Sequence, residues 1–190
     1  PPPPPKCPPP PPPTPHHFPY TTLFRSNKVT HLLTLPSFYG LILAQLKSPQ
    51  FNNLSTVIVA GEPCPRALVE RHRELLENTS LYSEYGATET TVFSSVYDCL
   101  DQRLNIAPLG EPIANAQMYI LNSRLQPVPV GVAGEVYFGG DGLAQGYLNR
   151  PVLTAERFIP NPFSKEPGAR LYQSGDLARH RPDGDIEFIG

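Results

Sequence analysis

Cysteine is scarce in this 190-residue sequence. Its three cysteines, Cys7, Cys64 and Cys99, are an odd number, and none belongs to a Cys-x-x-Cys pair. Disulfide-stabilised domains and structural zinc sites need several cysteines at short, regular spacings. The sequence therefore predicts neither a disulfide framework nor a zinc site, and Cys64 and Cys99 are expected to be structural.

Long apolar runs and an excess of basic charge are also missing. No run reaches the roughly 18–20 apolar residues of a membrane-spanning helix, and no signal-peptide pattern opens the chain. Only Lys6 and Arg25 are charged before Asn27, so residues 27–190 carry a net charge of about −4. This gives no electrostatic reason to expect nucleic acid or an anionic membrane as a partner. We expect a cytoplasmic protein.

Proline, by contrast, is abundant, and half of the 26 prolines lie before Tyr20. Such a tract favours the extended polyproline helix that SH3- and WW-type domains bind. A non-catalytic, proline-rich interaction protein is therefore one hypothesis. The stretch FPYTTLFRS, Phe18–Ser26, instead resembles the translation of a common sequencing adapter, residue for residue. On that interpretation residues 1–26 are artefactual and disordered, and the natural polypeptide begins near Asn27, within a domain.

Residues 27–107 show the pattern of part of an α/β domain. Apolar runs rich in β-branched residues alternate with segments whose apolar residues recur at helical spacing. The run Val57–Ala60 is apolar on both faces, as in a parallel sheet covered by helices. The resulting β-α-β-α-β order predicts a mostly parallel sheet. The predicted elements are strands at 28–35, 57–60 and 79–86 and helices at 36–47 and 66–77.

Residues 108–190 show a different pattern, typical of a small antiparallel, barrel-like β subdomain. Short alternating runs such as Gln117–Leu121 and Glu135–Phe138 are separated by proline and glycine about every eight to twelve residues. A short helix is predicted at 153–158, with Thr154 as its cap. Asp183-Gly184 predicts the turn of a hairpin between residues 177–180 and 185–189.

The segment YGATE, residues 85–89, follows a predicted parallel strand, where α/β proteins bind ligands. Tyr85 offers a flat face for a base, and Gly86 lets backbone approach a ligand closely. Thr88 offers a hydroxyl to a phosphate oxygen, and Glu89 is a hard oxygen ligand suited to Mg²⁺. By its composition alone, this segment fits a solvated turn better than a ligand site.

Three motifs occur in order along the chain: YGATETTV, GEVYFGGDGLAQGYLNRPVLTAERF and LYQSGDLARHRPDGDIEFIG. With them, the chain from about Lys28 to Gly190 resembles the adenylate-forming, AMP-binding enzymes, specifically the amino-acid adenylation domains of nonribosomal peptide synthetases. The phrase YILNSRLQPVPVGVAGEVYFGG is more similar to a peptide synthetase than to an acyl-CoA ligase or a luciferase. The chain is thus expected to be a central fragment of such a domain.

The resemblance implies a two-step reaction. An amino-acid carboxylate attacks the α-phosphate of ATP, which gives aminoacyl-AMP and pyrophosphate. The acyl group then passes to the phosphopantetheine thiol of a peptidyl carrier domain outside this chain. Because two anions must approach each other, Mg²⁺ and hydrogen-bond donors must offset their repulsion. ATP and Mg²⁺ are therefore the implied cofactors, and an amino acid and a carrier domain are the implied partners.

The resemblance also implies roles for individual residues. Tyr85 would stack on adenine beside Gly86, and Gly61 would line the adenine side of the cleft. Asp176 would accept hydrogen bonds from both ribose hydroxyls. The phosphate and metal contacts would be made by Thr88 and Glu89, and the amino-acid pocket would be formed by Thr34, Ile58, Ala60, Glu84, Val92 and Phe93.

This pocket is largely apolar, and Glu84 is its exception. If Glu84 faces the pocket, an unpaired carboxylate is costly there and would favour a substrate that carries a donor group; alternatively, it points elsewhere. Thr34 and Ile58 also fit buried strand positions, and Asp176 after Gly175 also fits a turn. Which amino acid is activated is not predicted.

The sequence departs from the family pattern at two places and lacks parts of it. Ala87 stands where many relatives have proline, and Gln173-Ser174 stands where Arg-Thr is usual. The lysine-bearing phosphate loop and the substrate-binding aspartate are missing, and the catalytic lysine is expected beyond Gly190. The chain alone is therefore predicted not to catalyse adenylation. Robust amino-acid-dependent ATP–pyrophosphate exchange by residues 27–190 would refute this.

Two alternatives stay open beside the peptide-synthetase interpretation. An acyl- or aryl-CoA ligase forms an adenylate from an acid that has no amine. The aspartate that neutralises the amine would separate the two, and it does not lie in this sequence. The interaction protein belongs to another class and requires that the proline tract is truly encoded.

Overall fold

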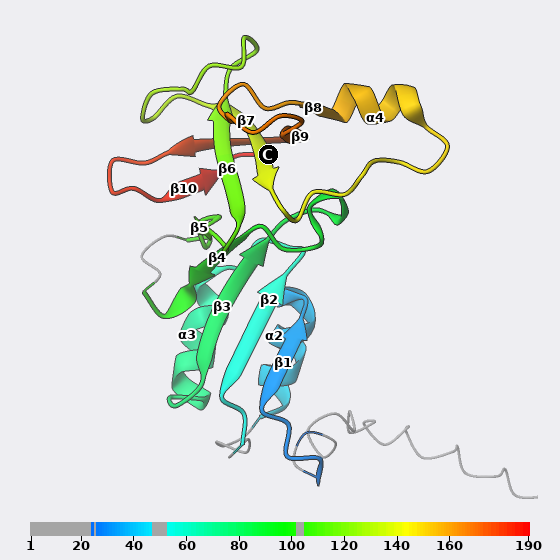
Figure 1. Ribbon diagram of the computed structural model, residues 1–190. Helices are drawn as coiled ribbons and strands as arrows, with labels where there is room; N and C mark the ends of the chain where they lie inside the picture. The colour runs from blue at the N-terminus through cyan, green and yellow to red at the C-terminus, as the bar shows by residue number, and fades with distance from the viewer. Residues whose placement is uncertain (1–23, 25, 47–52, 102–104) are drawn as a thin grey trace, which may run out of the picture.

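Two β-sheets, one above the other in Figure 1, make up the structure. This computed structural model describes residue 24 and residues 26–46, 53–101 and 105–190. The predictions for the proline tract and the adapter-like segment lie almost entirely outside these residues. The lower sheet comes from the first part of the chain and the upper sheet from the second, so the predicted change from α/β to antiparallel β structure is confirmed.

The lower sheet has the strand order β1-β2-β3-β4-β5, and its first three strands are parallel. Strands β4 and β5 join it in antiparallel orientation. Two helices connect the three parallel strands, as the predicted order requires. The elements are β1 (His31–Thr34), α2 (Pro36–Gln45), β2 (Thr56–Ala60), α3 (Arg66–Leu75), β3 (Ser80–Tyr85), β4 (Ser95–Asp98) and β5 (Glu111–Pro112).

Helices α2 and α3 pack on the same face of this sheet. Val57 and Val59 of β2 and Leu81 of β3 are fully buried in the resulting core. Because side chains alternate along a strand, Ile58 and Ala60 belong to the opposite face, and both are only partly buried. Helices of the described chain therefore cover β2 on one face (Figure 1), whereas the apolar run predicted a cover on both.

A buried polar pair fastens α2 to α3. His72 Nε2 lies 2.7 Å from the carbonyl oxygen of Thr79, which can only accept, so Nε2 carries the proton. The hydroxyl of Tyr39 therefore donates to the unprotonated Nδ1 over 2.6 Å. Burial keeps the pKa of His72 below its usual value. His72 is thus a neutral packing residue of the core.

The upper sheet has the strand order β10-β9-β7-β6, and all its pairings are antiparallel. Strand β8 adds to β9 beside the sheet, and a register shift in β7 lies between Glu135 and Tyr137. A core of aromatic and aliphatic side chains fills one face. The elements are β6 (Ala116–Leu121), β7 (Gly134–Gly140), α4 (Pro151–Arg157), β8 (Phe158–Pro160), β9 (Arg170–His180) and β10 (Ile186–Phe188).

The hairpin prediction is confirmed, and the helix-cap prediction is wrong. Ile186 pairs with His180 at the closed end of the β9–β10 hairpin, and Gly184 in its turn has a φ of +95°. Thr154, however, lies inside α4, which begins at Pro151. Its hydroxyl accepts from the Tyr147 amide and donates to the Arg150 carbonyl, each over 2.9 Å. A proline at the first helical position starts the helix earlier than the apolar pattern indicates.

The two sheets meet at the carboxyl end of β3. Leu109 donates its amide to the Ile186 carbonyl of the upper sheet over 2.9 Å, while its own carbonyl accepts from the hydroxyl of Ser95 in the lower sheet over 2.6 Å. Tyr85, the last residue of β3, packs against the core of the upper sheet. The lower sheet extends to β5, a few residues beyond residue 107, and a domain boundary there stays a prediction.

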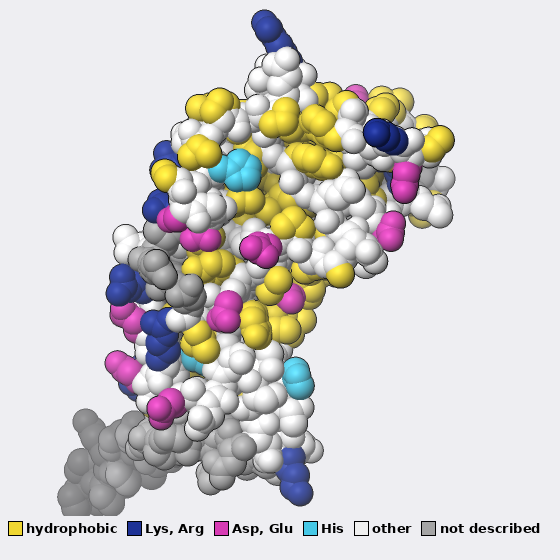
Figure 2. Space-filling model, turned by 60° about the vertical axis from the view of Figure 1, so that its left-hand side comes forward, with side chains coloured by type: hydrophobic (Ala, Val, Ile, Leu, Met, Phe, Trp, Pro, Cys, Tyr) yellow, Lys and Arg dark blue, Asp and Glu magenta, His cyan; other side chains and the backbone are white. Residues whose placement is uncertain are grey.

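Three further predictions from composition concerned the cysteines, membrane-spanning helices and the distribution of charge. Cys64 and Cys99 are buried and free of disulfides. No helix in the described ranges is long and apolar enough to cross a membrane. On the face shown in Figure 2, Lys and Arg side chains are scattered among acidic ones, and apolar side chains gather on the upper part.

Candidate functional site

The loop after β3 is held rigidly by its own hydrogen bonds. A short 3-10 helix, η1 (Thr88–Thr90), follows Ala87. The Thr90 hydroxyl accepts from the Ala87 amide over 3.1 Å and donates to the Ala87 carbonyl over 3.0 Å, while Ser94 donates to it over 2.6 Å. Buried Thr90 thereby fixes the turn, which leaves the side chain of Thr88 exposed.

Two β-branched residues of this loop have left-handed backbones. Thr91 has a φ of 59° and Val92 a φ of 74°. Such conformations cost on the order of 1–3 kcal/mol each and occur mainly at functional sites. The Thr91 hydroxyl donates to the Gly142 carbonyl over 2.6 Å, and the Val92 amide donates to the Ala87 carbonyl over 3.1 Å. These bonds hold the strained segment in place.

Gly86 is required by the loop itself. A Cβ atom at this position would lie 2.3 Å from the Val92 carbonyl oxygen and 2.8 Å from the Ser94 amide nitrogen. Because these atoms belong to the backbone, a Cβ at such distances would force the turn to shift. The close approach that the sequence predicted for a ligand is thus also made by the chain's own backbone.

Tyr85 and Asp176, which the resemblance assigns to one nucleotide, are in direct contact. The Tyr85 hydroxyl donates to Asp176 Oδ2. The ring of Tyr85 lies 5.8 Å from that of Phe138 and 6.2 Å from that of Phe188, between centroids. Burial and the hydrogen bond to Asp176 raise the pKa of Tyr85. The structure therefore joins residues 91 positions apart at the junction of the two sheets.

Glu135 positions the part of strand β9 that carries Asp176. One carboxylate oxygen accepts from the Gly175 amide over 2.9 Å, and the other accepts from the Gln173 side-chain amide over 2.8 Å. Ser174 donates its hydroxyl to the Val136 carbonyl and accepts the Asp176 amide over 3.0 Å. Gln173 and Ser174, the departures from the family pattern, thus take part in shaping this irregular part of β9.

Glu89 faces the upper sheet. Its Oε1 accepts a 2.6 Å hydrogen bond from the Tyr147 hydroxyl, and its carbonyl accepts from the Ala144 amide over 2.8 Å. Burial raises the pKa of Glu89, but hydrogen bonds from Tyr147, its own backbone and Tyr172, with the charge of Arg157, outweigh it and leave the pKa below its usual value. Glu89 is therefore held as a carboxylate.

The residues around Glu89 fit a magnesium ion of the kind that nucleotides carry. Among the described residues no group of three or more histidine, cysteine or carboxylate side chains could enclose a metal. Mg²⁺ bound with a nucleotide needs only one or two carboxylates, because phosphates and waters complete its shell. An ionised carboxylate with one oxygen oriented by Tyr147 meets that requirement.

Two hollows share a wall at the ends of the parallel strands. One, of about 180 Å³, lies at the sheet junction, and the other, of about 400 Å³, lies beside β1. Gly61, Glu84 and Gly86 line both. The first hollow also contains Tyr85, Ser83 and Phe188, so it combines the predicted adenine wall with the aromatic side of the upper sheet.

The second hollow gathers most of the predicted amino-acid pocket. Thr34, Ala60, Glu84, Val92 and Phe93 all line it, together with Thr88. Ile58 does not. It lies two residues before Ala60 on the same strand face, farther from the loop. Sequence positions from β1, β2, β3 and the following loop therefore converge on one surface.

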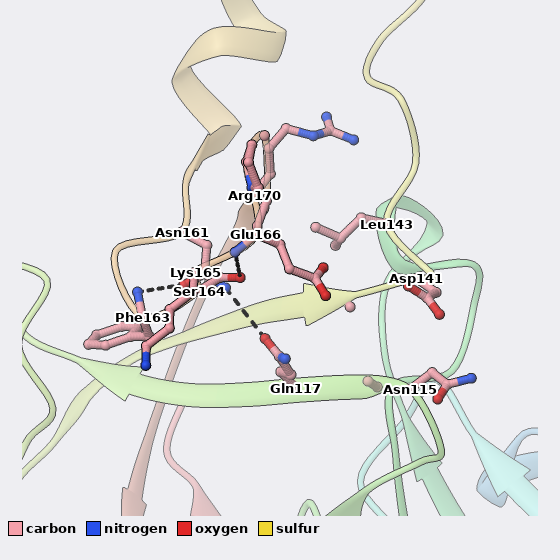
Figure 3. Close-up of a pocket in the computed structure, with 15 residues that line it drawn as sticks. Asn115, Gln117, Asp141, Leu143, Asn161, Phe163, Ser164, Lys165, Glu166 and Arg170 are labelled. Atoms are coloured by element: carbon pink, nitrogen blue, oxygen red, sulfur yellow. Dashed lines mark hydrogen bonds between the residues drawn. The ribbon is translucent and has the colours of Figure 1, made fainter.

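A larger hollow, of about 790 Å³, lies away from these residues, on the upper sheet. Figure 3 shows Gln117 on β6 facing Asn161, whose side chains are joined by a 3.4 Å hydrogen bond. Side chains of both charges line this hollow. One of them, the Arg170 guanidinium, donates to the carbonyls of Ala144 and Gln145. Because no predicted site residue lines this hollow, we assign it no ligand.

Sequence reasoning missed several residues of the site. Tyr147 lies within the second of the three motifs, yet no spacing shows that its hydroxyl reaches Glu89. Phe188 and Glu135 belong to strands that only the fold brings to Tyr85 and Asp176. Glu62, next to Gly61, accepts both the amide and the hydroxyl of Ser37, each over 3.0 Å, at the start of α2.

Comparison with known proteins identifies relatives among peptide synthetases. The chain is 45% identical over 168 residues to bacitracin synthase 3 of Bacillus licheniformis, which covers 88% of this chain and 3% of that protein. It is 43% identical over 167 residues to tyrocidine synthase 3 of Brevibacillus parabrevis, covering 87% and 2%. The chain therefore spans only a few per cent of the length of these relatives.

Solved structures show the same fold. The nonribosomal peptide synthetase FmoA3 with bound AMPPNP matches with a TM-score of 0.82 and 32% identity, over 90% of this chain and 19% of that one. The N-terminal subdomain of Klebsiella oxytoca NpsA with 3-hydroxybenzoyl-AMSN matches with a TM-score of 0.79 and 28% identity, over 95% and 44%. At the level of sequence, the family model described as AMP-binding enzyme matches residues 7–148. The chain belongs to the family of AMP-binding enzymes.

Proposed function

We propose that this chain is part of an adenylation domain that activates an amino acid as aminoacyl-AMP for nonribosomal peptide synthesis. The observation that carries the proposal is the pair of hollows that share Gly61, Glu84 and Gly86. The two hollows are adjacent at these shared residues. A nucleotide in one hollow and an acyl group in the other would therefore place the substrate carboxylate close to the α-phosphate. The similarity to peptide synthetases supports the same assignment.

In this proposal the junction of the sheets binds adenosine. The ring of Tyr85, with Gly61 and Gly86 beside it, forms the wall for adenine, because an aromatic face and bare backbone permit stacking and close approach. Asp176, already an acceptor for the Tyr85 hydroxyl, turns its carboxylate to the ribose hydroxyls. FmoA3, which has an AMPPNP-bound structure, supports ATP as the nucleotide.

Thr88 and Glu89 would receive the phosphates and their magnesium ion. When bound, Mg²⁺ reduces the repulsion between the substrate carboxylate and the phosphates. Tyr147 holds one Glu89 oxygen on the side of the upper sheet, and the side chain of the adjoining Thr88 is exposed. Glu89 and Thr88 thereby supply an anion and a donor on the same short loop.

The partners and location follow from the proposed reaction. Thr34, Ile58, Ala60, Glu84, Val92 and Phe93 would surround the amino acid, with Ile58 at the outer edge. FmoA3 has a structure with α-methyl-L-serine-AMP, which supports an amino-acid substrate. The acyl group would pass to the phosphopantetheine of a peptidyl carrier domain, and the use of ATP fits a cytoplasmic location.

Binding measurements on the full chain test the proposal. We expect AMP to bind in isothermal titration calorimetry, and an aminoacyl sulfamoyl adenosine, a stable mimic of the adenylate, to bind more tightly. Asp176→Asn should weaken both about tenfold, because it removes a charged acceptor for the ribose. Asp141→Asn, on the far hollow, is the matched control. A well-folded chain that binds neither compound would contradict the proposal.

A second candidate, activation of an aryl acid, is favoured by one comparison. The NpsA subdomain, with its 3-hydroxybenzoyl ligand, has a fold similar to that of this chain. The two candidates separate in the same titration. Tighter binding of a benzoyl sulfamoyl adenosine than of any aminoacyl one would favour the aryl acid, and the reverse order would favour the amino acid.

A further inference from the structure

Glu84 has an acceptor that nothing in the described chain satisfies. Its Oε2 is buried from solvent, and no described group donates to it. A carboxylate oxygen without water or a donor is strongly disfavoured, so native proteins rarely keep one without a functional reason. Burial accordingly raises the pKa of Glu84.

The neighbours of Glu84 on the sheet explain why it stays unpaired. Its partner in parallel β2 is Ala60, and its partner in antiparallel β4 is Val96. Paired residues on adjacent strands project to the same face, so Glu84 lies between two apolar side chains. Within the described lining of the second hollow, Glu84 is the one charged residue among mostly aliphatic, aromatic and glycine positions.

Strand alternation assigns Glu84 to the acyl side of the shared wall. Tyr85 follows it directly, and its side chain reaches Phe138, Phe188 and Asp176 at the sheet junction. Successive strand residues point to opposite faces, so the carboxylate of Glu84 belongs to the face of Ala60. Glu84 also lines the first hollow, but its partner Ala60 lines only the second, so we assign the donor for Oε2 to the group in the second hollow.

We infer that the acyl substrate carries a hydrogen-bond donor on its side chain, a hydroxyl, amide or ammonium group, that binds Glu84 Oε2. This inference rests on the proposed function and adds to it the class of amino acid. An apolar side chain of equal size would leave the carboxylate buried and unpaired. A site built to bind a substrate hydroxyl or amine discriminates strongly against analogues that lack it.

A panel of aminoacyl sulfamoyl adenosines tests the inference on the full chain by calorimetry. Leucyl is the apolar member, tyrosyl and glutaminyl carry neutral donors, ornithyl carries a cation, and glycyl carries only the α-amine. We expect at least one donor-bearing member to bind ten or more times more tightly than leucyl. In Glu84→Ala this advantage should vanish, whereas Glu84→Gln, which keeps an acceptor, should retain part of it. Asp141→Asn, on the far hollow, is the control and should leave the binding of AMP and of the whole panel unchanged.

Each outcome decides a different point. If AMP and the whole panel fail to bind the folded chain, the proposed function fails and the inference fails with it. If the panel binds but leucyl matches the best donor-bearing member, the proposed function stands and the inference is overturned. A glycyl compound that depends on Glu84 as strongly as the others would assign the donor to the α-amine, and would also overturn it. Thermal melts confirm that Glu84→Ala is folded.

Discussion

The hydroxyl of Tyr147 donates a 2.6 Å hydrogen bond to Glu89 Oε1, across 58 residues of sequence, and so joins the segment between β7 and α4 to the loop after β3. This bond fixes the orientation of the one carboxylate in the loop after β3 that is suited to a metal. We expect Tyr147→Phe to fold normally and to weaken Mg²⁺-dependent ATP binding about fivefold, the effect of one hydrogen bond of about 1 kcal/mol. Titration calorimetry with and without Mg²⁺ measures this.

The control for that change is Tyr119→Phe, which removes a hydroxyl bonded to Gln117 on the surface of β6. It should leave nucleotide binding unchanged. If Tyr147→Phe weakens binding equally with and without Mg²⁺, Tyr147 does not act through the metal ligand.

Tyr85 should act through its ring more than through its hydroxyl. Tyr85→Phe keeps the aromatic face and frees Asp176, so AMP affinity should stay within about threefold. Tyr85→Ala removes the stacking surface, which is worth about 1–3 kcal/mol, and should weaken AMP binding at least fivefold. Equal losses for both variants would show that the bond to Asp176, rather than stacking, matters for binding.

Gly86 should tolerate no side chain. Gly86→Ala places a Cβ 2.3 Å from the Val92 carbonyl and should lower the free energy of unfolding by about 2–3 kcal/mol. Gly40→Ala in α2 is the matched control, because its Cβ would meet only Leu68 Cδ1 at 3.7 Å. It should be neutral or stabilising by up to about 1 kcal/mol. Urea denaturation that ranks the two variants equally would contradict this account.

His72 should make the chain sensitive to mild acid. Its folded pKa is lowered by burial, so the unfolded chain takes up a proton first as pH falls below about 6.5. Stability is therefore full above that pH and declines as pH falls toward the lowered folded pKa. His72→Gln, which can keep both hydrogen bonds but cannot titrate, should lose this part of the decline. His31→Gln, at an exposed position, should behave like the parent chain.

Glu84 should lower the free energy of unfolding at neutral pH in the absence of substrate. Its folded pKa is raised by burial, so the neutral form is favoured in the fold and stability falls as pH rises through that pKa. Glu84→Gln should therefore be more stable than the parent at pH 7, by about 1 kcal/mol. The difference should shrink below the ordinary pKa of about 4.5. Thermal melts at pH 4 and pH 7 give the comparison, and a destabilised Glu84→Gln at pH 7 would contradict it.

The sequence by itself determined the order and type of the long elements. Helix α3 is recognisable from its period of 3.6, which follows from burying one face. Strand β2 is recognisable as a short apolar run instead, and α2 as an apolar segment that begins with proline. Proline at the start of α2 and Asp183-Gly184 in the last hairpin act locally as well. The short strands β4, β5 and β8 carry too few residues for a period to be recognised.

What only the tertiary structure decided are the contacts between elements far apart in the chain. Nothing near Tyr85 in sequence indicates Asp176 or Phe188, and nothing near Glu89 indicates Tyr147, because these contacts depend on how the second sheet docks on the end of β3. The unpaired state of Glu84 likewise depends on Ala60 and Val96, its partners on two other strands. The chemistry of each side chain follows from the sequence alone, but its pairing, burial and strain are properties of the packed chain.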